Sequence, residues 1–367
     1  MPRGPRSPAV GSPLVATRTL WIGTYPPAGI GTPPGRGEGI YRVDLDPVSG
    51  VLSTPWRVVE TPAPSFVVRR PDGTVLYAAD ESEAGLVAAF RVHDERLEPL
   101  GTASSGGAHP CHLLLDGDRL YAANYGDGAL GVLSLAADGT FVADEPQVLH
   151  HTGSGPDADR QEGPHAHFVA LAPGGHVLAV DLGTDEVRRY RRTPAGLAPA
   201  GVAATLPAGT GPRHLVLGRG FAYLTGELDS TVHVLRWDAA TDTGVLVQTL
   251  PAPGAAEEPG VAGGDARVAG SPAPSHLALD GRELVVGVRG VGALSRFAVA
   301  DDGLLTHVAD QPLPTGTPRH HAVVDGWTVV AEQVPGAVTA LARSGRVVSS
   351  RALPSAACVL PDGGDPR

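Results

Sequence analysis

The sequence predicts an all-β fold, a seven-bladed β-propeller whose ring is closed by pairing of the C-terminal strand with the N-terminal strands. A short signature of Pro, a small residue or Arg, and usually His precedes two apolar strands joined by a turn, and it occurs seven times. Successive signatures lie 46, 55, 47, 62, 44 and 36 residues apart, which is the size of a propeller blade. The 49 Gly and 35 Pro supply turns for many short strands, and no long stretch has apolar residues at helical spacing.

The seven copies of the signature share their place at the start of the first strand of each blade. They are Pro64-Ser65-Phe66, Pro110-Cys111-His112, His165-Ala166-His167, Pro212-Arg213-His214, Pro274-Ser275-His276, Pro318-Arg319-His320 and Pro354-Ser355-Ala356.

One blade can be followed strand by strand in residues 111–142. Strand one is expected at 111–115, a turn at Asp116-Gly117-Asp118, strand two at 120–124 and strand three at 129–135, and Ala137-Asp138-Gly139-Thr140 leads into strand four. Asp-Gly pairs recur at Asp72-Gly73, Asp138-Gly139, Asp280-Gly281 and Asp302-Gly303, where a tight turn requires positive φ.

The last copy of the signature lies near the end of the chain, and only one further strand, around Cys358-Val359-Leu360, follows it. Residues 18–25 have the pattern of a second strand that lacks a first. We therefore expect the two ends of the chain to complete one sheet and close the ring.

The repeat continues through the chain without a change in composition, which favours one domain over residues 18–367. Residues 1–17 are rich in Pro, Gly and Ser and contain no apolar run of signal-peptide length, so we expect a disordered N-terminal tail.

Composition excludes several classes of function. The formal net charge of −11 argues against nucleic acid as a partner, and no segment approaches the roughly 20 apolar residues of a membrane helix. With two cysteines, neither a disulfide framework nor a zinc site is indicated, and we expect no metal and no cofactor. A cytoplasmic protein, a monomer or a weak homo-oligomer, is expected. Lysine is absent, so every basic group is an Arg or a His.

Polar residues are expected at one mouth of the channel, because the start of strand one and the end of strand two of every blade reach it. Aligning the repeats places Tyr25, Glu81, Tyr125, Leu182, Glu227, Arg289 and Gln333 at the end of strand two. The middle of the signature contributes Ser65, Cys111, Ala166, Arg213, Ser275, Arg319 and Ser355. At both sets of positions the residue type differs from blade to blade. Such differences at one mouth suggest a specific small-molecule site.

Some of these residues have a structural interpretation and others a chemical one. The signature histidines His112, His276 and His320 are expected to bond backbone between blades, and Arg319 suits a structural ion pair as well as a site. His165 differs, because it replaces Pro and follows the polar segment 150–163. Arg213 and Arg289 flank Glu227 in the predicted ring, an arrangement suited to anionic substrates and developing oxyanions.

Several motifs together resemble the seven-bladed propeller lactonase family, which includes 6-phosphogluconolactonase and carboxy-cis,cis-muconate cyclase. They are Trp21-Ile22-Gly23-Thr24-Tyr25, Pro110-Cys111-His112 with Asn124-Tyr125-Gly126, Pro164-His165-Ala166-His167, Asp181-Leu182-Gly183, Gly211-Pro212-Arg213-His214 and Pro318-Arg319-His320. The resemblance implies catalytic roles for His165, Arg213, Glu227 and Arg289. Substrate-binding roles are expected for Tyr25, Asn124, Tyr125, His167, Asp181, His214, Arg319, His320 and Gln333.

The function implied by this resemblance is hydrolysis of a small anionic sugar-acid lactone, with 6-phosphogluconolactone of the pentose phosphate pathway as the expected substrate. His165 and Glu227 are both candidates for the base that activates water, and Arg213 and Arg289 are expected on the oxyanion or a substrate phosphate. Two alternatives remain, a carboxy-muconate-type cyclase that uses the same residues and a non-catalytic scaffold for a protein partner.

Overall fold

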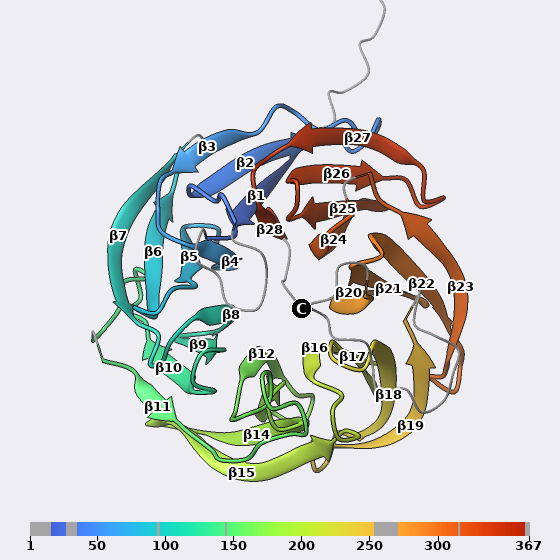
Figure 1. The fold of residues 1–367 in the computed structure, drawn as a ribbon. Coiled ribbons are helices and arrows are strands. Elements are labelled where there is room, and N and C mark those ends of the chain that lie inside the picture. The colour runs from blue at the N-terminus through green and yellow to red at the C-terminus, as the bar shows by residue number, and fades with distance from the viewer. Residues whose placement is uncertain are drawn as a thin grey trace, which may run out of the picture.

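The computed structural model describes residues 16–26, 35–93, 96–143, 145–252, 271–314 and 316–363. Within these ranges the chain forms seven four-stranded antiparallel sheets arranged as a ring (Figure 1). The predicted seven-bladed propeller is therefore confirmed. No helix in the described ranges is long and apolar enough to cross a membrane.

The strands follow the chain blade by blade, and each blade begins with its innermost strand. The first three complete blades are β4 (Pro64–Arg69), β5 (Val75–Asp80), β6 (Leu86–Val92) and β7 (Leu97–Ser104); β8 (Pro110–Asp116), β9 (Arg119–Asn124), β10 (Leu130–Ser134) and β11 (Gln147–Leu149); and β12 (Ala166–Leu171), β13 (Val177–Asp181), β14 (Glu186–Thr193) and β15 (Gly196–Thr205). The next three are β16 (Pro212–Gly218), β17 (Phe221–Gly226), β18 (Thr231–Asp238) and β19 (Thr243–Pro251); β20 (Ala273–Asp280), β21 (Glu283–Arg289), β22 (Ala293–Val299) and β23 (Leu305–Pro312); and β24 (Pro318–Val324), β25 (Trp327–Glu332), β26 (Ala337–Leu341) and β27 (Val347–Ala352).

The seventh blade joins the two ends of the chain, as predicted. Its order is β28 (Ala356–Pro361), β1 (Arg18–Thr24), β2 (Ile40–Leu45) and β3 (Trp56–Val59). Strand β28 pairs with β1 from Leu20↔Pro361 to Thr24↔Ala356, and the Asp362 amide donates to the Thr19 carbonyl at 2.8 Å. The four predicted Asp-Gly turns also form, with φ between 62° and 87° at Gly73, Gly139, Gly281 and Gly303.

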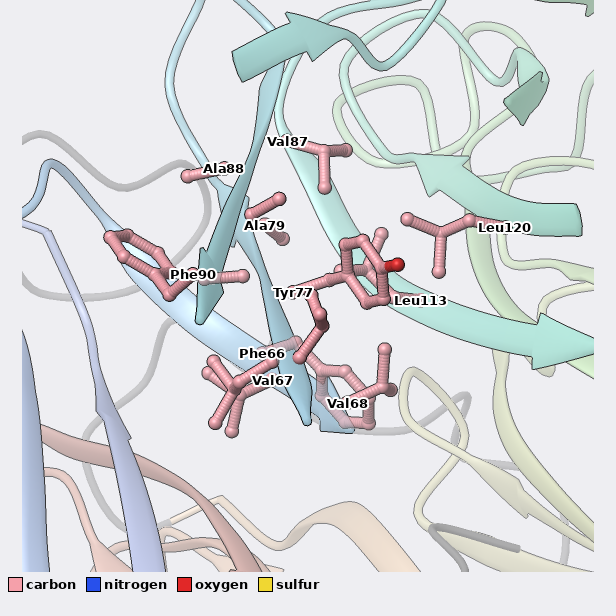
Figure 2. Packing of buried hydrophobic residues seen from close by; sticks show 14 of the residues in the cluster. Phe66, Val67, Val68, Tyr77, Ala79, Val87, Ala88, Phe90, Leu113 and Leu120 are labelled. Carbon is pink, nitrogen blue, oxygen red and sulfur yellow. The ribbon is translucent and has the colours of Figure 1, made fainter. Parts of the chain in front are cut away.

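The core lies between neighbouring blades, where the apolar faces of two twisted sheets meet. Figure 2 shows this packing for Tyr77 and Val87 of one blade against Leu113 and Leu120 of the next, while Phe90 lies on the opposite face of its sheet. The buried Tyr77 hydroxyl donates to the Gly139 carbonyl of that next blade at 2.7 Å. Tyr223 makes the equivalent bond to Gly303 at 3.1 Å, so the blades are joined by polar contacts as well as by apolar surface.

Two of the seven signatures are shifted by one residue relative to the sequence alignment. Strand β12 starts at Ala166, opposite Asp181, just as β8 starts at Pro110, opposite Asn124. His167 therefore takes the place that Cys111 has in its own blade, and Phe168 the place of His112. In the closing blade, Ala356 pairs with Thr24, so Ala357 takes the ring position predicted for Ser355. The copy at His165 has no Pro at this position, and in the closing blade Pro354 lies two residues before the strand start, so neither copy fixes the phase.

A layer of buried aromatic rings lies inside the channel, below the mouth. Each member directly follows the mouth residue of its innermost strand. Its members are Phe66, His112, Phe168, His214, His276 and His320, with ring centroids of neighbouring members 3.9–5.7 Å apart. The backbone amides of Val169 and Val359 in the following blades donate to Nδ1 of His112 and His320 at 3.3 and 3.4 Å. The predicted bond between blades is confirmed for these two histidines, whereas Nδ1 of His276 instead lies 3.0 Å from Nδ1 of His214.

This layer predicts acid-sensitive stability. Burial, followed by nearby His and Arg charges, lowers the pKa of His112, His214, His276 and His320 well below the ordinary value. The unfolded chain, with histidine pKa values of about 6.5, binds more protons than the native state below that pH. Stability is therefore complete above about pH 6.5 and decreases as the pH falls, by about 1.4 kcal/mol per pH unit for each such histidine.

Urea unfolding between pH 8 and pH 5 measures this effect. The unfolding free energy is expected to be constant above pH 7 and to fall steeply below pH 6. His276→Phe is expected to reduce the slope of free energy against pH by about 1.4 kcal/mol per pH unit, which corresponds to one proton. An equal slope in the wild type and in His276→Phe would show that this histidine is not held neutral.

Candidate active site

The candidate site lies at the channel mouth where the innermost strands begin, and its centre is the buried carboxylate of Glu227. Glu227 directly follows β17, and three guanidinium groups surround it. Arg213 Nε and Arg289 Nη2 lie 2.9 and 2.6 Å from Oε2, and Arg160 Nη2 lies 2.9 Å from Oε1. Three positive charges and one negative charge leave this group with a net charge of +2.

The ion cluster changes the ionisation of its members. Burial alone would raise the pKa of Glu227, but the charges of Arg289, Arg160 and Arg213 outweigh it and hold that pKa well below the ordinary value. Burial, together with the charges of Arg289 and Arg319, lowers the pKa of Arg213 to about 9. Arg213 Nη1 is buried and has no hydrogen-bond partner among the described residues. This guanidinium is therefore available to an anionic or carbonyl oxygen that enters the mouth.

His165 joins this cluster through Tyr125. His165 Nδ1 donates to the Tyr125 carbonyl oxygen at 2.6 Å, and the two rings stack with centroids 4.7 Å apart. The Tyr125 hydroxyl accepts hydrogen bonds from Arg160 at 3.0 and 3.2 Å. Because the carbonyl can only accept, Nδ1 holds a proton and Nε2 is the nitrogen that can take one. Glu162 Oε1 lies 3.2 Å from Nε2, on a side chain that is 58% exposed.

Arg160 and Glu162 were not predicted from the sequence. Both come from the segment 150–163, which reaches the mouth because it is tied to its own blade. His151 Nε2 lies 2.9 Å from Asp181 Oδ2, and Gln161 donates to Asp185 Oδ1 and to the Leu182 carbonyl, each at 2.9 Å. The only sequence signal was the polar composition of this segment, since it occupies no position that repeats from blade to blade.

The structure brings the four predicted catalytic residues, His165, Arg213, Glu227 and Arg289, into one connected cluster. Tyr125 belongs to it, and His167 lies beneath Tyr125, with ring centroids 5.6 Å apart and Nδ1 3.7 Å from Cys111 Sγ. Burial is the main cause that lowers the pKa of His167 well below its ordinary value.

Four residues predicted to bind substrate lie elsewhere. Asp181 is fully buried, and Oδ1 accepts from the amides of His165 and Thr184 at 3.0 and 2.9 Å, so it anchors the site from behind. Asn124 bonds the Ala129 carbonyl in its own blade and Ser105, which follows β7 of the preceding blade. His214 and His320 belong to the ring layer below the mouth. These positions favour structural roles over contacts with substrate, and the substrate-binding roles of the four residues stay predictions.

Arg319, Gln333 and Tyr25 form a second cluster at the same mouth. The Arg319 guanidinium lies 4.0 Å from the centroid of the Tyr25 ring, and its Nη1 donates to Gln333 Oε1 at 3.2 Å. Its Nη2 lies 3.5 Å from Glu81 Oε1.

Two cavities of about 450 and 470 Å³ lie at the other end of the channel. They are lined by the later residues of the innermost strands, among them Leu215–Leu217 in one and Ala322–Val324 in the other. We place the site at the first mouth, because the buried ion cluster is there. Among the described residues, no three or more His, Cys, Asp or Glu side chains are placed to hold a metal ion.

Residues 19–361 match the family model described as "Lactonase, 7-bladed beta-propeller". The chain belongs to this lactonase family. A 6-phosphogluconolactonase of Bacillus subtilis is 28% identical to it over 92% of this chain and 95% of the relative. A 6-phosphogluconolactonase of Sodalis glossinidius is 33% identical over 71% and 76% of the two chains. The solved structure of a Pseudomonas aeruginosa periplasmic gluconolactonase has 28% identity and a TM-score of 0.82, and covers 94% of this chain and 99% of that one.

Proposed function

We propose that this lactonase-family protein hydrolyses a sugar-acid lactone, with 6-phosphogluconolactone as the expected substrate and the cytoplasm as the expected compartment. The observation that carries the proposal is the +2 cluster around Glu227 next to His165, whose Nδ1 is held by the Tyr125 carbonyl. Such a cluster attracts an anionic ester and stabilises the oxyanion that forms when its carbonyl is attacked.

In the proposed mechanism His165 is the base, and the charges around Glu227 support this choice between the two candidates that the sequence left open. A carboxylate held by three guanidinium groups is a poor proton acceptor, so Glu227 serves to position Arg213 and Arg289. Nε2 of His165 takes a proton from water as the water oxygen bonds to the lactone carbonyl carbon, and the carbonyl electron pair moves to oxygen beside the arginines. The Glu162 carboxylate then faces the imidazolium.

The second step opens the ring. The oxyanion electron pair re-forms the carbonyl, the bond to the ring oxygen breaks, and the imidazolium gives its proton to the leaving alkoxide. The product is a carboxylic acid that releases its proton to solvent and leaves as a carboxylate, and His165 is neutral again. The step needs water alone as co-reactant, and positioning with one proton transfer is sufficient for a lactone that already hydrolyses slowly unaided.

The test is hydrolysis of freshly prepared 6-phosphoglucono-1,5-lactone followed by pH-stat, with the spontaneous rate subtracted. Turnover well above the spontaneous rate by the wild type is expected. Turnover absent on this lactone and on glucono-1,5-lactone would overturn the proposal. In that case carboxy-muconate tests the cyclase alternative, for which the same four residues would act.

Arg160 supplies a specific prediction for this site. Arg160→Met removes one of the three charges that face an anionic substrate, and we expect KM to rise about tenfold while kcat changes less than about threefold. Arg188→Met is the matched control, because Arg188 pairs with Glu186 on β14, away from the mouth. A KM equal to that of the control would show that Arg160 does not face the substrate.

A further inference from the structure

The second cluster at the mouth differs in charge from the cluster around Glu227. It spans three consecutive blades, with Arg319 on β24 and Gln333 after β25, Tyr25 after β1, and Glu81 after β5. All four residues are more than nine-tenths buried. One guanidinium and one carboxylate sum to zero, whereas the cluster around Glu227 has a net charge of +2.

Two buried polar atoms of this cluster have no hydrogen-bond partner among the described residues. They are Gln333 Nε2 and Glu81 Oε2. The guanidinium of Arg319 can only donate, so it fixes Gln333 Oε1 toward itself and leaves the amide NH₂ as a donor. The cluster thus offers a free donor and a free acceptor on either side of Arg319. Buried polar groups are almost always paired, so these atoms indicate a ligand.

The chemistry of the free atoms selects the class of ligand. A hydroxyl group donates and accepts at once, so adjacent hydroxyls can bond Gln333 Nε2 and Glu81 Oε2 together. A phosphate or carboxylate can only accept, and it would be repelled by the Glu81 carboxylate. The neutral cluster therefore suits a polyol, and the anionic part of a ligand is left to the cluster around Glu227.

The two clusters face the same space. Arg213 and Arg319 hold equivalent positions at the start of the innermost strands β16 and β24, directly after Pro212 and Pro318. Glu227 and Gln333 likewise directly follow β17 and β25 at the same end of the channel. One small molecule at the mouth can therefore reach both.

We infer that Glu81, Gln333 and Arg319 form a hydroxyl-recognition subsite that determines specificity for polyhydroxylated lactones, an inference that rests on the proposed lactonase function. In a 1,5-lactone of a hexonic acid, the carbonyl carbon and the carbon bearing C6 both flank the ring oxygen. The hydroxyls at C2, C3 and C4 lie on the side of the ring away from the ring oxygen. The carbonyl and the C6 phosphate thus lie toward Arg213 and Arg289, and the hydroxyls toward Glu81 and Gln333.

The experiment compares two lactones with the same ring. The 6-phosphoglucono-1,5-lactone carries the three hydroxyls, and δ-valerolactone carries none. Gln333→Leu is expected to lower kcat/KM for the hydroxylated lactone about tenfold and that for δ-valerolactone less than twofold. Gln311→Leu, on the outer strand β23, is the matched control and is expected to change neither value. Glu81→Gln is the second variant and should show the same split if Gln333→Leu fails to fold.

A second readout separates this inference from the proposed function. Calorimetry with 6-phosphogluconate, which keeps the three hydroxyls, measures binding without turnover, and Gln333→Leu is expected to bind about tenfold more weakly than Gln311→Leu. Equal losses of kcat/KM on the two lactones in Gln333→Leu would overturn the subsite. So would 6-phosphogluconate binding that is absent in the wild type, or equally strong in Gln333→Leu and Gln311→Leu. If the wild type hydrolyses neither lactone but 6-phosphogluconate binding depends on Gln333, the hydrolytic function fails and the polyol subsite stands.

Discussion

Glu227→Gln is expected to lower the free energy of unfolding by about 3–5 kcal/mol and to reduce lactone hydrolysis at least about a hundredfold. The carboxylate is 4% exposed and balances part of the charge of Arg160, Arg213 and Arg289. A neutral amide leaves three guanidinium groups crowded in a buried site, where their mutual repulsion is weakly screened. Urea unfolding and pH-stat assays measure the two effects.

Glu283→Gln is the matched control for this prediction. Glu283 also pairs with an arginine, Arg296, at 2.8 Å, but its side chain is 31% exposed and lies at the start of β21, away from the mouth. The control is expected to lose less than about 1 kcal/mol of stability and no activity. If Glu227→Gln were as stable as Glu283→Gln, the carboxylate would not be the group that holds the three arginines together.

His165→Asn is expected to lower kcat by a factor of about 10² to 10⁴ while stability changes little. Asparagine can still donate to the Tyr125 carbonyl, where His165 Nδ1 donates at 2.6 Å, but it cannot accept a proton from water. The measurement is the rate at saturating lactone, corrected for spontaneous hydrolysis, between pH 6 and 8.

His93→Asn serves as the control for the histidine replacement. His93 follows β6 on the outside of its blade, where it pairs with Glu98 at 2.7 Å, and the replacement is expected to leave kcat unchanged. A kcat within twofold of the wild type in His165→Asn would exclude this histidine as the base and return the assignment to another group at the mouth.

The fold was predictable because a repeated local signal specifies it. Each Pro at a strand start and each Asp-Gly turn marks the same point of a blade, so seven copies predict seven blades and their order. The phase was wrong at His165, where the marker was missing, and at Ser355, where Pro354 lies two residues before the strand start, so the neighbouring side chains lie in other layers than predicted. A shift of one residue matters in a strand because neighbouring side chains point to opposite faces.

The site was predictable in part for the same reason. Arg213, Glu227 and Arg289 stood out because they replace other residues at repeated positions, and the structure brings them into contact. Arg160 and Glu162 lie on an irregular segment, and nothing local shows that it turns toward the mouth. Its position depends on His151 meeting Asp181 and Gln161 meeting Asp185, contacts between residues that sequence spacing does not pair.

The closure of the ring has a consequence for synthesis of the protein. Strand β1 is among the first parts of the described chain to leave the ribosome, yet its inner edge is covered only by β28, whose first residue is Ala356. Until then the nascent chain carries an exposed strand edge and an open channel, the kind of surface on which chains associate wrongly. A chain that stops before Ala356 would therefore form six complete blades and an exposed strand edge rather than a slightly smaller propeller.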